Sequence, residues 1–408
     1  MTLKYLFGNE SAIRYMARQQ NAIWIGAVLV LTSGIAREYD QTYIFVKPFV
    51  FLAPFLISLL ASGFIYVFVV LLNRPRPPAA STLPDPPTKW ITFRTFLALF
   101  WMMAPLAWLY AIPFERYLGR AESASANIAL LSIIAIWRVV LLSRITAILS
   151  NTPFLRSLFS VLLPCSMLLF IASIFTSFSL IRGMGGMEYS PEDVVIHHAA
   201  GVAFLGSIVA GLVSFIGLFL AKRGAPPPSA MPLASKPLPF LSMACILTFW
   251  CAITVAPQRE LGLNHTASLL CNSQKYKKLL AFLSQQAPEA FSPVHRLPPD
   301  PYEYSGLQHL PEIVGAMDGS EKSWVREHYL DDLIVVLDHA SYWYSDPNQV
   351  RLLNISMALE RIPEGRRWAL IHKETLQKAA TALDESTESP ALVDSFFRLG
   401  VVEKASKP

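Results

Sequence analysis

The feature that most constrains this chain is a run of 22 largely apolar residues with an arginine at its centre. Ile128–Leu149 reads IALLSIIAIWRVVLLSRITAIL, with Arg138 in the middle beside Trp137. About 20 apolar residues are enough to cross a bilayer as one helix. A guanidinium at mid-membrane costs about 2.5–3.5 kcal/mol on insertion scales, so it normally faces protein or water rather than lipid. We therefore expect the other membrane spans to pack around this helix.

Further long apolar runs predict a protein that crosses the membrane several times. Hydrophobic residues make up 53% and charged residues 15% of the 408 residues, whereas ordinary soluble domains contain about 25% charged residues. The sequence predicts an all-α fold, with a polytopic transmembrane helical bundle of about seven spans followed by a small soluble all-α domain. The predicted spans are Ala22–Ala36, Pro48–Leu72, Thr95–Pro113, Ile128–Leu149, Ser157–Ile181, Ala199–Ala221 and Leu238–Ala256.

This pattern divides the chain into parts of different character. The predicted parts are residues 1–20, a cytoplasmic amphipathic segment; residues 21–256, the transmembrane domain with proline-rich cytoplasmic linkers at 73–90 and 222–239; and residues 257–408, the soluble helical domain. Within the first part, residues 5–18 predict one short amphipathic helix at the membrane interface. The proline density of the linkers favours an extended, solvated chain.

The distribution of lysine and arginine predicts the orientation. Residues 1–256 carry a net charge of +9 and residues 257–408 one of −4. Twelve Lys and Arg fall on the side of the N-terminus and both linkers, against five on the other side. The positive-inside rule therefore places the N-terminus in the cytoplasm of a cell (inner) membrane, and seven spans then place residues 257–408 outside. The acidic balance of that last part argues against nucleic acid as a partner, because such binding requires a basic surface.

Finer patterns predict particular contacts. Ala203, Ser207 and Gly211 recur every four residues in the sixth span, a spacing of small residues that lets two helices approach closely. In the last domain, Ser268–Gln286 predicts one amphipathic helix, and Ser320 is the expected N-cap of the helix that follows it.

Arg138 is the first candidate functional residue. As a functional group it would line a pathway for an anion, a substrate or a proton. As a structural group it would bond to backbone carbonyls or hydroxyls of neighbouring helices. Since no Asp or Glu stands at mid-span in this sequence, a buried ion pair is not evident and the proton-relay interpretation is weakened.

A second candidate is a polar cluster on the predicted outer face. Its members are Glu38, Asp40, Glu115, Asp193, His197 and His198. Converging acids and imidazoles would bind a divalent metal or act as acid and base, and Met184 and Met187 would favour copper. The alternative is that polar residues at span ends simply meet the headgroups, so the sequence predicts no firm metal site.

Other candidates have simpler interpretations, and we expect no cofactor. Cys165, Cys245, Cys251 and Cys271 form no CxxC pair and are interpreted as small buried hydrophobic residues. His328, Asp332 and His339 share one helical stripe, but a rise of about 1.5 Å per residue leaves the two histidines about 16 Å apart, too far for one metal ion. We interpret this stripe as a solvated polar face.

Three classes of function remain open on the sequence. The leading hypothesis is a non-enzymatic membrane protein for envelope assembly, scaffolding or signalling, which contacts the lipid bilayer and presents residues 257–408 to a protein partner. The second is a transporter with Arg138 near its pathway, which broken helices or inverted repeats would support. The third is a membrane-embedded enzyme that uses the outer acid and histidine cluster.

Overall fold

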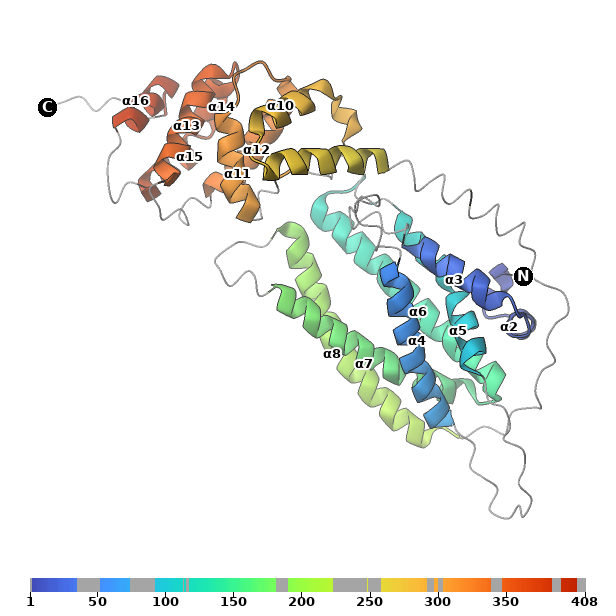
Figure 1. Cartoon of the computed structure of the whole chain (residues 1–408). Coiled ribbons are helices and arrows are strands. Elements are labelled where there is room, and N and C mark those ends of the chain that lie inside the picture. Colours follow the sequence, from blue (N-terminus) through green and yellow to red (C-terminus); the bar gives the residue numbers. More distant parts are fainter. Residues whose placement is uncertain are drawn as a thin grey trace, which may run out of the picture. The chain divides into compact units, whose positions relative to one another are not determined.

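The computed structural model of this chain is helical throughout the part that it describes, which comprises residues 2–34, 52–73, 92–112, 114, 117–180, 190–222, 248, 258–291, 297–299, 304–338, 347–383 and 390–401. No strand occurs among these residues. The chain divides into two compact units, which we describe separately. The first contains the helices from α1 to α8 and the second those from α10 to α16 (Figure 1).

The first unit has the composition of a membrane bundle. Its elements are α1 (Thr2–Leu6), α2 (Glu10–Ala17), α3 (Ala22–Ser33), α4 (Leu52–Asn73), α5 (Phe93–Trp101), the 3₁₀ helix η3 (Ala104–Ala111), α6 (Arg120–Ser150), α7 (Phe154–Leu180) and α8 (Pro191–Leu220). Among the described residues, five helical stretches are long and apolar enough to cross a membrane: Leu52–Asn73, Phe93–Ala111, Ala121–Ser150, Phe154–Thr176 and Pro191–Leu220. The chain therefore has the character of a membrane protein, with five candidate spans.

The first and seventh predicted spans are not among these five candidate spans. Helix α3 has 12 residues, which makes it about 18 Å long, whereas a bilayer core is about 30 Å thick. The predicted span Ala22–Ala36 is therefore too short, in the described residues, to cross on its own. The seventh span, Leu238–Ala256, and both proline-rich linkers lie almost entirely outside the described residues.

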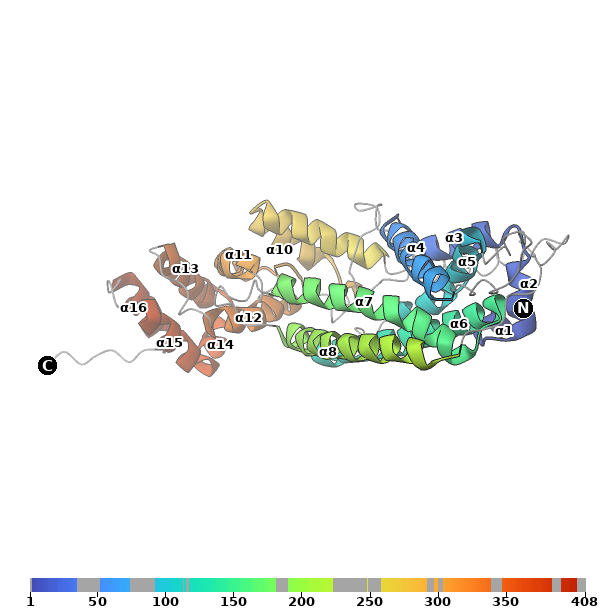
Figure 2. The same ribbon diagram turned by 90° about the horizontal axis from the view of Figure 1, so that it is seen from below.

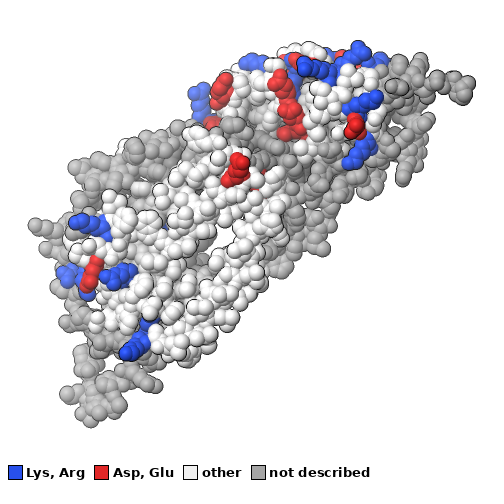
Figure 3. Space-filling view, turned by 180° about the vertical axis from the view of Figure 1, so that it is seen from behind, with Lys and Arg blue, Asp and Glu red and all other residues white. Residues whose placement is uncertain are grey.

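The outer surface of the first unit is apolar. Only 17% of the apolar windows of α4 and of α8 is buried, and both helices expose large apolar side chains. The most exposed of these are Leu60, Val202, Phe219 and Leu220. Figure 3 shows a wide uncharged area on this unit, with Lys and Arg gathered at one end. An apolar exterior is what a lipid environment allows and water does not.

Helix α6 contacts α2, η3, α7 and α8, but it is not the most buried of the candidate spans. The α5–η3 stretch is 56% buried, whereas the apolar window of α6 is 28% buried. The predicted span Thr95–Pro113 corresponds to the candidate span Phe93–Ala111, but it is built from two helices, because α5 ends at Trp101 and η3 begins at Ala104. Pro105 explains the break, since a proline ring collides with the carbonyl four residues before it and supplies no N–H.

The helices α3 and α5 run parallel and in close contact. A Cβ on Gly26 would stand 2.7 Å from the Cβ of Trp101, so only glycine allows this approach. Further along both segments, the indole of Trp108 donates to Thr32 Oγ1 at 3.3 Å. The short α3 therefore packs against the broken third span rather than standing as an independent one.

The prediction of one interfacial helix over residues 5–18 is also corrected. Gly8, at a φ of +73°, divides the segment into α1 and α2. The apolar face of the two helices is covered by protein, with Tyr5, Ile13 and Met16 at most 1% exposed. The N-terminal segment is thus part of the bundle core, together with residues of α5 and α6.

The small residues of α8 lie against α7, as their spacing predicts. Figures 1 and 2 show the two helices side by side along most of their lengths. A Cβ on Gly211 would lie 3.2 Å from Ser166 Oγ, and one on Gly217 would lie 2.4 Å from the Phe159 ring. Ser207, which precedes both glycines on α8, is buried as well. This face confirms the predicted close contact.

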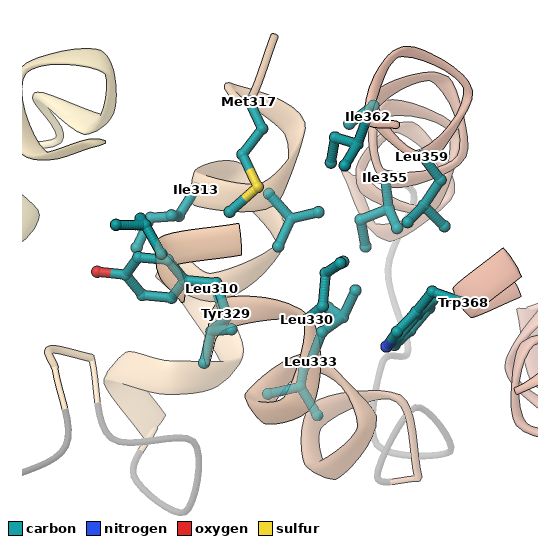
Figure 4. Close-up of a cluster of buried hydrophobic side chains, with 14 of the residues drawn as sticks. Leu310, Ile313, Met317, Tyr329, Leu330, Leu333, Ile355, Leu359, Ile362 and Trp368 are labelled. Carbon is teal, nitrogen blue, oxygen red and sulfur yellow. The ribbon is translucent and has the colours of Figure 1, made fainter. Parts of the chain in front are cut away.

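The second unit is a helical domain with its own apolar core. After a helical segment over residues 258–272 come α10 (Tyr276–Gln285), the 3₁₀ helix η6 (Pro288–Ala290), α11 (Tyr304–Gly315), α12 (Ser323–Asp338), α13 (Pro347–Arg361), α14 (Gly365–Ile371), α15 (Lys373–Leu383) and α16 (Pro390–Leu399). In Figure 4, apolar side chains of α11, α12 and α13 converge with Trp368 of α14.

Three predictions for this unit are wrong. The helix expected over Ser268–Gln286 is interrupted after residue 272, where Gln274 has a φ of +56°. Ser320 does not cap α12, because that helix begins at Ser323. The N–H of Ser320 instead donates to Asp318 Oδ1. Asp332 is not on a solvated face, because it is 5% exposed. The helical periodicity of the sequence places Asp332 opposite the apolar stripe, but in the structure other parts of the unit cover its side chain.

Candidate functional site

The candidate site around Arg138 lies where α6 meets the N-terminal segment. Arg138 is half-buried, and its Nε is buried and has no hydrogen-bond partner. The phenol of Tyr110, on η3, lies within electrostatic range of the guanidinium. The broken third span therefore provides a neighbour of Arg138.

The adjacent Trp137 anchors the N-terminal segment to α6. Its Nε1 donates to Leu6 O at 2.9 Å, and its ring lies 5.3 Å from that of Phe7, centre to centre. Leu6 is the last residue of α1, where helix carbonyls have no partner within the helix. The indole thus satisfies a carbonyl that would otherwise be unpaired next to the bundle.

Tyr5 makes a matching bond to the broken span. In α5 the N–H of Met103 donates to Phe100 O, so it does not continue the helical pattern to Leu99 O. The Tyr5 hydroxyl, fully buried, donates to Leu99 O at 2.6 Å. Non-helical backbone at membrane depth is tolerated when protein groups satisfy it. Tyr5 is a residue that sequence reasoning missed, because its pattern shows only an amphipathic helix.

A second polar centre, also missed from the sequence, surrounds Arg156 near the start of α7. Its Nη1 donates to Leu218 O at 3.2 Å and to Ala221 O at 3.0 Å, and its Nη2 donates to Leu72 O at 2.7 Å. The acceptors lie at the C-terminal ends of α8 and α4, where the helix dipoles are negative. Arg156, 6% exposed, therefore joins two helix ends to a third helix.

Side-chain bonds extend this centre along α4 and α7. Asn73 Nδ2 donates to Ser160 Oγ at 2.9 Å, and the hydroxyls of Thr152 and Ser157 lie 2.5 Å apart. A sequence signal for this centre exists, since Arg156 follows Pro153 within the first turn of an apolar helix. We interpreted that arginine only as a charge that sets orientation.

The outer polar cluster is only partly within the described residues. Glu38, Asp40, Glu115, Met184 and Met187 lie outside them. His197 and His198 are exposed on α8, and Asp193 is half-buried one turn before His197. Among the described residues no group of three His, Cys, Asp or Glu is placed to hold a metal ion. Convergence of this cluster stays a prediction.

In the second unit, polar groups form structural contacts. Arg326 donates from Nε to Glu364 Oε2 at 3.1 Å and from Nη2 to Oε1 at 2.9 Å, and these hydrogen bonds lower the pKa of Glu364. The Nη1 of Arg326 also donates to the carbonyls of Gly319 and Glu321. The His328 ring lies 3.5 Å from the buried carboxylate of Asp332.

The cysteines within the described residues behave as the sequence predicts. Cys271 is 1% exposed, and burial raises the pKa of its thiol to about 11. A thiol with that pKa is protonated at neutral pH and is a poor nucleophile and metal ligand. Cys165 is half-buried in α7, and Cys245 and Cys251 lie outside the described residues.

Taken together, the Arg138 site offers a half-buried guanidinium with an unpaired, buried Nε, beside a broken span. Such a donor can bind an anionic or carbonyl oxygen, and it can equally serve helix packing. No family model matches the chain, and neither a curated protein nor a solved structure does. Function is therefore argued from these residues.

Proposed function

We propose that this chain is an integral protein of the cell (inner) membrane that binds a partner protein through its C-terminal helical unit. The first unit supplies a lipid-facing anchor, which its apolar exterior supports. The topology we propose has the N-terminus in the cytoplasm and residues 257–408 outside. Arg94 near the start of α5, Arg156 near the start of α7 and Lys222 after the end of α8 agree with a common cytoplasmic side.

The observation that carries the partner surface is the exposed face of α14. Trp368 and Ala369 are buried, whereas Leu370 and Ile371 are 49% and 67% exposed. Arg366 and Arg367, each four residues before one of this pair, are exposed too. Residues four apart share a helix face. We name Arg366, Arg367, Leu370 and Ile371 the α14 surface.

The composition of the α14 surface indicates the chemistry of its partner. Two adjacent aliphatic side chains fit an apolar groove, and arginines at an interface pair with carboxylates at the rim. The proposed partner is a protein with an apolar groove bordered by Asp and Glu. Such a contact depends on salt, because its rim charges are screened.

Site-specific photocrosslinking in intact cells tests this function. A photoreactive residue at position 371 should give one discrete crosslinked protein, and the yield should fall at least fivefold when Arg366 and Arg367 are both changed to Glu. A photoreactive residue at Leu269, which is 54% exposed in the same unit, is the matched control. Equal crosslinking from both positions, or no effect of charge reversal, would contradict the proposal.

A transporter is the second candidate, because Tyr110 on η3, the second half of the broken third span, lies within electrostatic range of Arg138. Discontinuous helices commonly line substrate sites near the bilayer midplane. In a chain without its native cysteines, Cys introduced at position 138 should react with a water-soluble methanethiosulfonate reagent if Arg138 lines a pathway. Cys introduced at the exposed, lipid-facing Ile136 is the control. Equal lack of reaction at both positions would refute a pathway.

A further inference from the structure

The connection between α2 and α3 concentrates buried polar atoms that have no partner. Gln19 is 6% exposed, and both its Nε2 and its Oε1 are buried without a hydrogen bond. The same is true of Nδ2 and Oδ1 of Asn21 and of Nε of Arg18. Native proteins leave few buried polar atoms unpaired, and such groups normally meet a water, an ion or a ligand. Five such atoms within four residues indicate that something binds there.

The backbone around this connection favours a negative ligand. Arg94, on the first turn of α5, donates from Nη2 to Gln20 O at 3.2 Å. The parallel helices α3 and α5 therefore begin beside each other, each with the positive end of its dipole. Neither helix has an acidic residue in its first turn, and Asn21 does not cap α3 with its side chain. The Thr92 side chain caps α5, whereas α3 has no side-chain cap, so the start of α3 is the helix end that favours an anion.

The side chains at this connection also favour a negative ligand. Arg18 and Arg94 supply guanidinium groups, which recognise phosphate oxygens. The amide nitrogens of Gln19 and Asn21 are further donors, and their oxygens can accept from a hydroxyl or ammonium group attached to the phosphate. The nearest acid on α2, Glu10, is bonded to Arg14 at 2.8 Å and does not compete.

The position of the connection relates it to the membrane. Trp24, on the first turn of α3, is 71% exposed next to an apolar helix. Exposed tryptophan is characteristic of the headgroup level of a bilayer. A phosphate bound at the start of α3 would therefore lie at the depth where lipid phosphates occur.

We propose that Arg18, Gln19 and Asn21, with Arg94 and the start of α3, form a binding site for a phosphate group. Its two possible sources are a phospholipid headgroup and free phosphate. This site is separate from the α14 surface and does not depend on the proposed partner.

The test titrates the full-length protein in detergent with two probes. These are dioctanoyl phosphatidylglycerol and inorganic phosphate, and the readouts are the thermal midpoint and lipid adducts in native mass spectrometry. Saturable binding of the lipid and not of phosphate identifies a headgroup site. Saturable binding of both identifies a general phosphate site. No saturable binding of either probe overturns the proposal.

Variants assign the binding to these residues. Arg18→Gln and Gln19→Glu should each weaken binding at least tenfold, the second because an isosteric carboxylate repels phosphate. Lys4→Gln, which removes an exposed positive charge from α1, should bind as the wild type does. If Gln19→Glu fails to fold, Gln19→Leu replaces it, since it removes two unpaired atoms and retains the volume. Unchanged affinity in Arg18→Gln and in the folded Gln19 variant would contradict the proposal.

Discussion

The two units of this chain are both helical and both have an apolar core, but the first also turns many large apolar side chains outward. In the first unit, Leu60 and Phe219 are exposed while Ser160 and Ser214 are fully buried. In the second unit, Leu310 and Leu333 are fully buried and form its core. The hydrophobic effect can hold the second unit together, whereas in lipid it gives little drive for helices to associate. The first unit must rely on close backbone packing and on hydrogen bonds.

The two units also differ in how they neutralise a buried arginine. Arg156 in the first unit donates to backbone carbonyls at the ends of two helices. Arg326 in the second unit pairs with the carboxylate of Glu364, which is partly exposed to water. The comparison shows that carbonyls at helix C-termini accept hydrogen bonds from a buried guanidinium in one unit, as a carboxylate does in the other.

The largest effect is expected for Arg156→Ala. This change leaves the carbonyls of Leu72, Leu218 and Ala221 without their donor, and each buried acceptor left unpaired costs about 1–3 kcal/mol. We expect the thermal midpoint of the protein in detergent to fall by about 10 °C. The control is Arg144→Ala, which removes an exposed arginine from α6. Equal midpoints for the two variants would show that helix ends do not depend on Arg156.

A smaller effect is expected for Tyr5→Phe. Loss of the hydroxyl leaves Leu99 O unpaired inside the bundle, at a cost of about 1–3 kcal/mol. Hydrogen exchange should increase in α1 and around the break after α5, while the second unit stays protected. Tyr117→Phe removes a hydroxyl from a tyrosine that is 80% exposed and should change nothing. If Tyr5→Phe also leaves exchange unchanged, the N-terminal segment does not stabilise the broken span.

The smallest effect concerns the second unit and depends on pH. Arg326 lowers the pKa of Glu364, so the stabilisation is present above the unfolded pKa of about 4.3 and is lost as pH falls through the lower, folded value. At pH 7, Glu364→Gln should cost about 1 kcal/mol, reduced from the value for charged hydrogen bonds because Glu364 is partly exposed.

Denaturant unfolding of the second unit at pH 7 and pH 3 measures this effect. The difference between wild type and Glu364→Gln should shrink at pH 3. The exposed Glu374, in the first turn of α15, provides a control as Glu374→Gln. A difference that persists at pH 3 would contradict the assigned ion pair.

The sequence predicted helices better than it predicted their interruptions. The lengths of the apolar runs correctly predicted α4, α6, α7 and α8, because length and composition are enough to identify a long span. Pro105 ends α5 four residues earlier, whereas Pro164 remains inside α7. The same residue type thus has two outcomes, which depend on whether neighbouring groups accommodate the unbonded carbonyl. That information lies in tertiary contacts.

The polar centres were harder to predict than the spans. Arg138 is recognisable in the sequence, because a charge in a long apolar run is unusual. Its neighbours could not be inferred, because the sequence does not show that the third span breaks and places η3 next to α6. Arg156 and Tyr5 stand near chain features that suggest an interface, and their acceptors are 62 to 94 residues away in the sequence. These hydrogen bonds are accepted by backbone carbonyls. Every residue type has such a carbonyl, so the acceptors leave no pattern in the sequence.

The most direct test of the contrast between the units is labelling in membranes by a lipid-soluble diazirine, followed by mapping of the modified residues. We expect labels on the outward faces of α4 and α8, including Leu60, Leu205 and Phe219. We expect none on the core residues Leu310 and Leu333 of the second unit, which are no less apolar. Labelling of that core to the same extent as α8, or absence of labels from α4 and α8, would contradict the account.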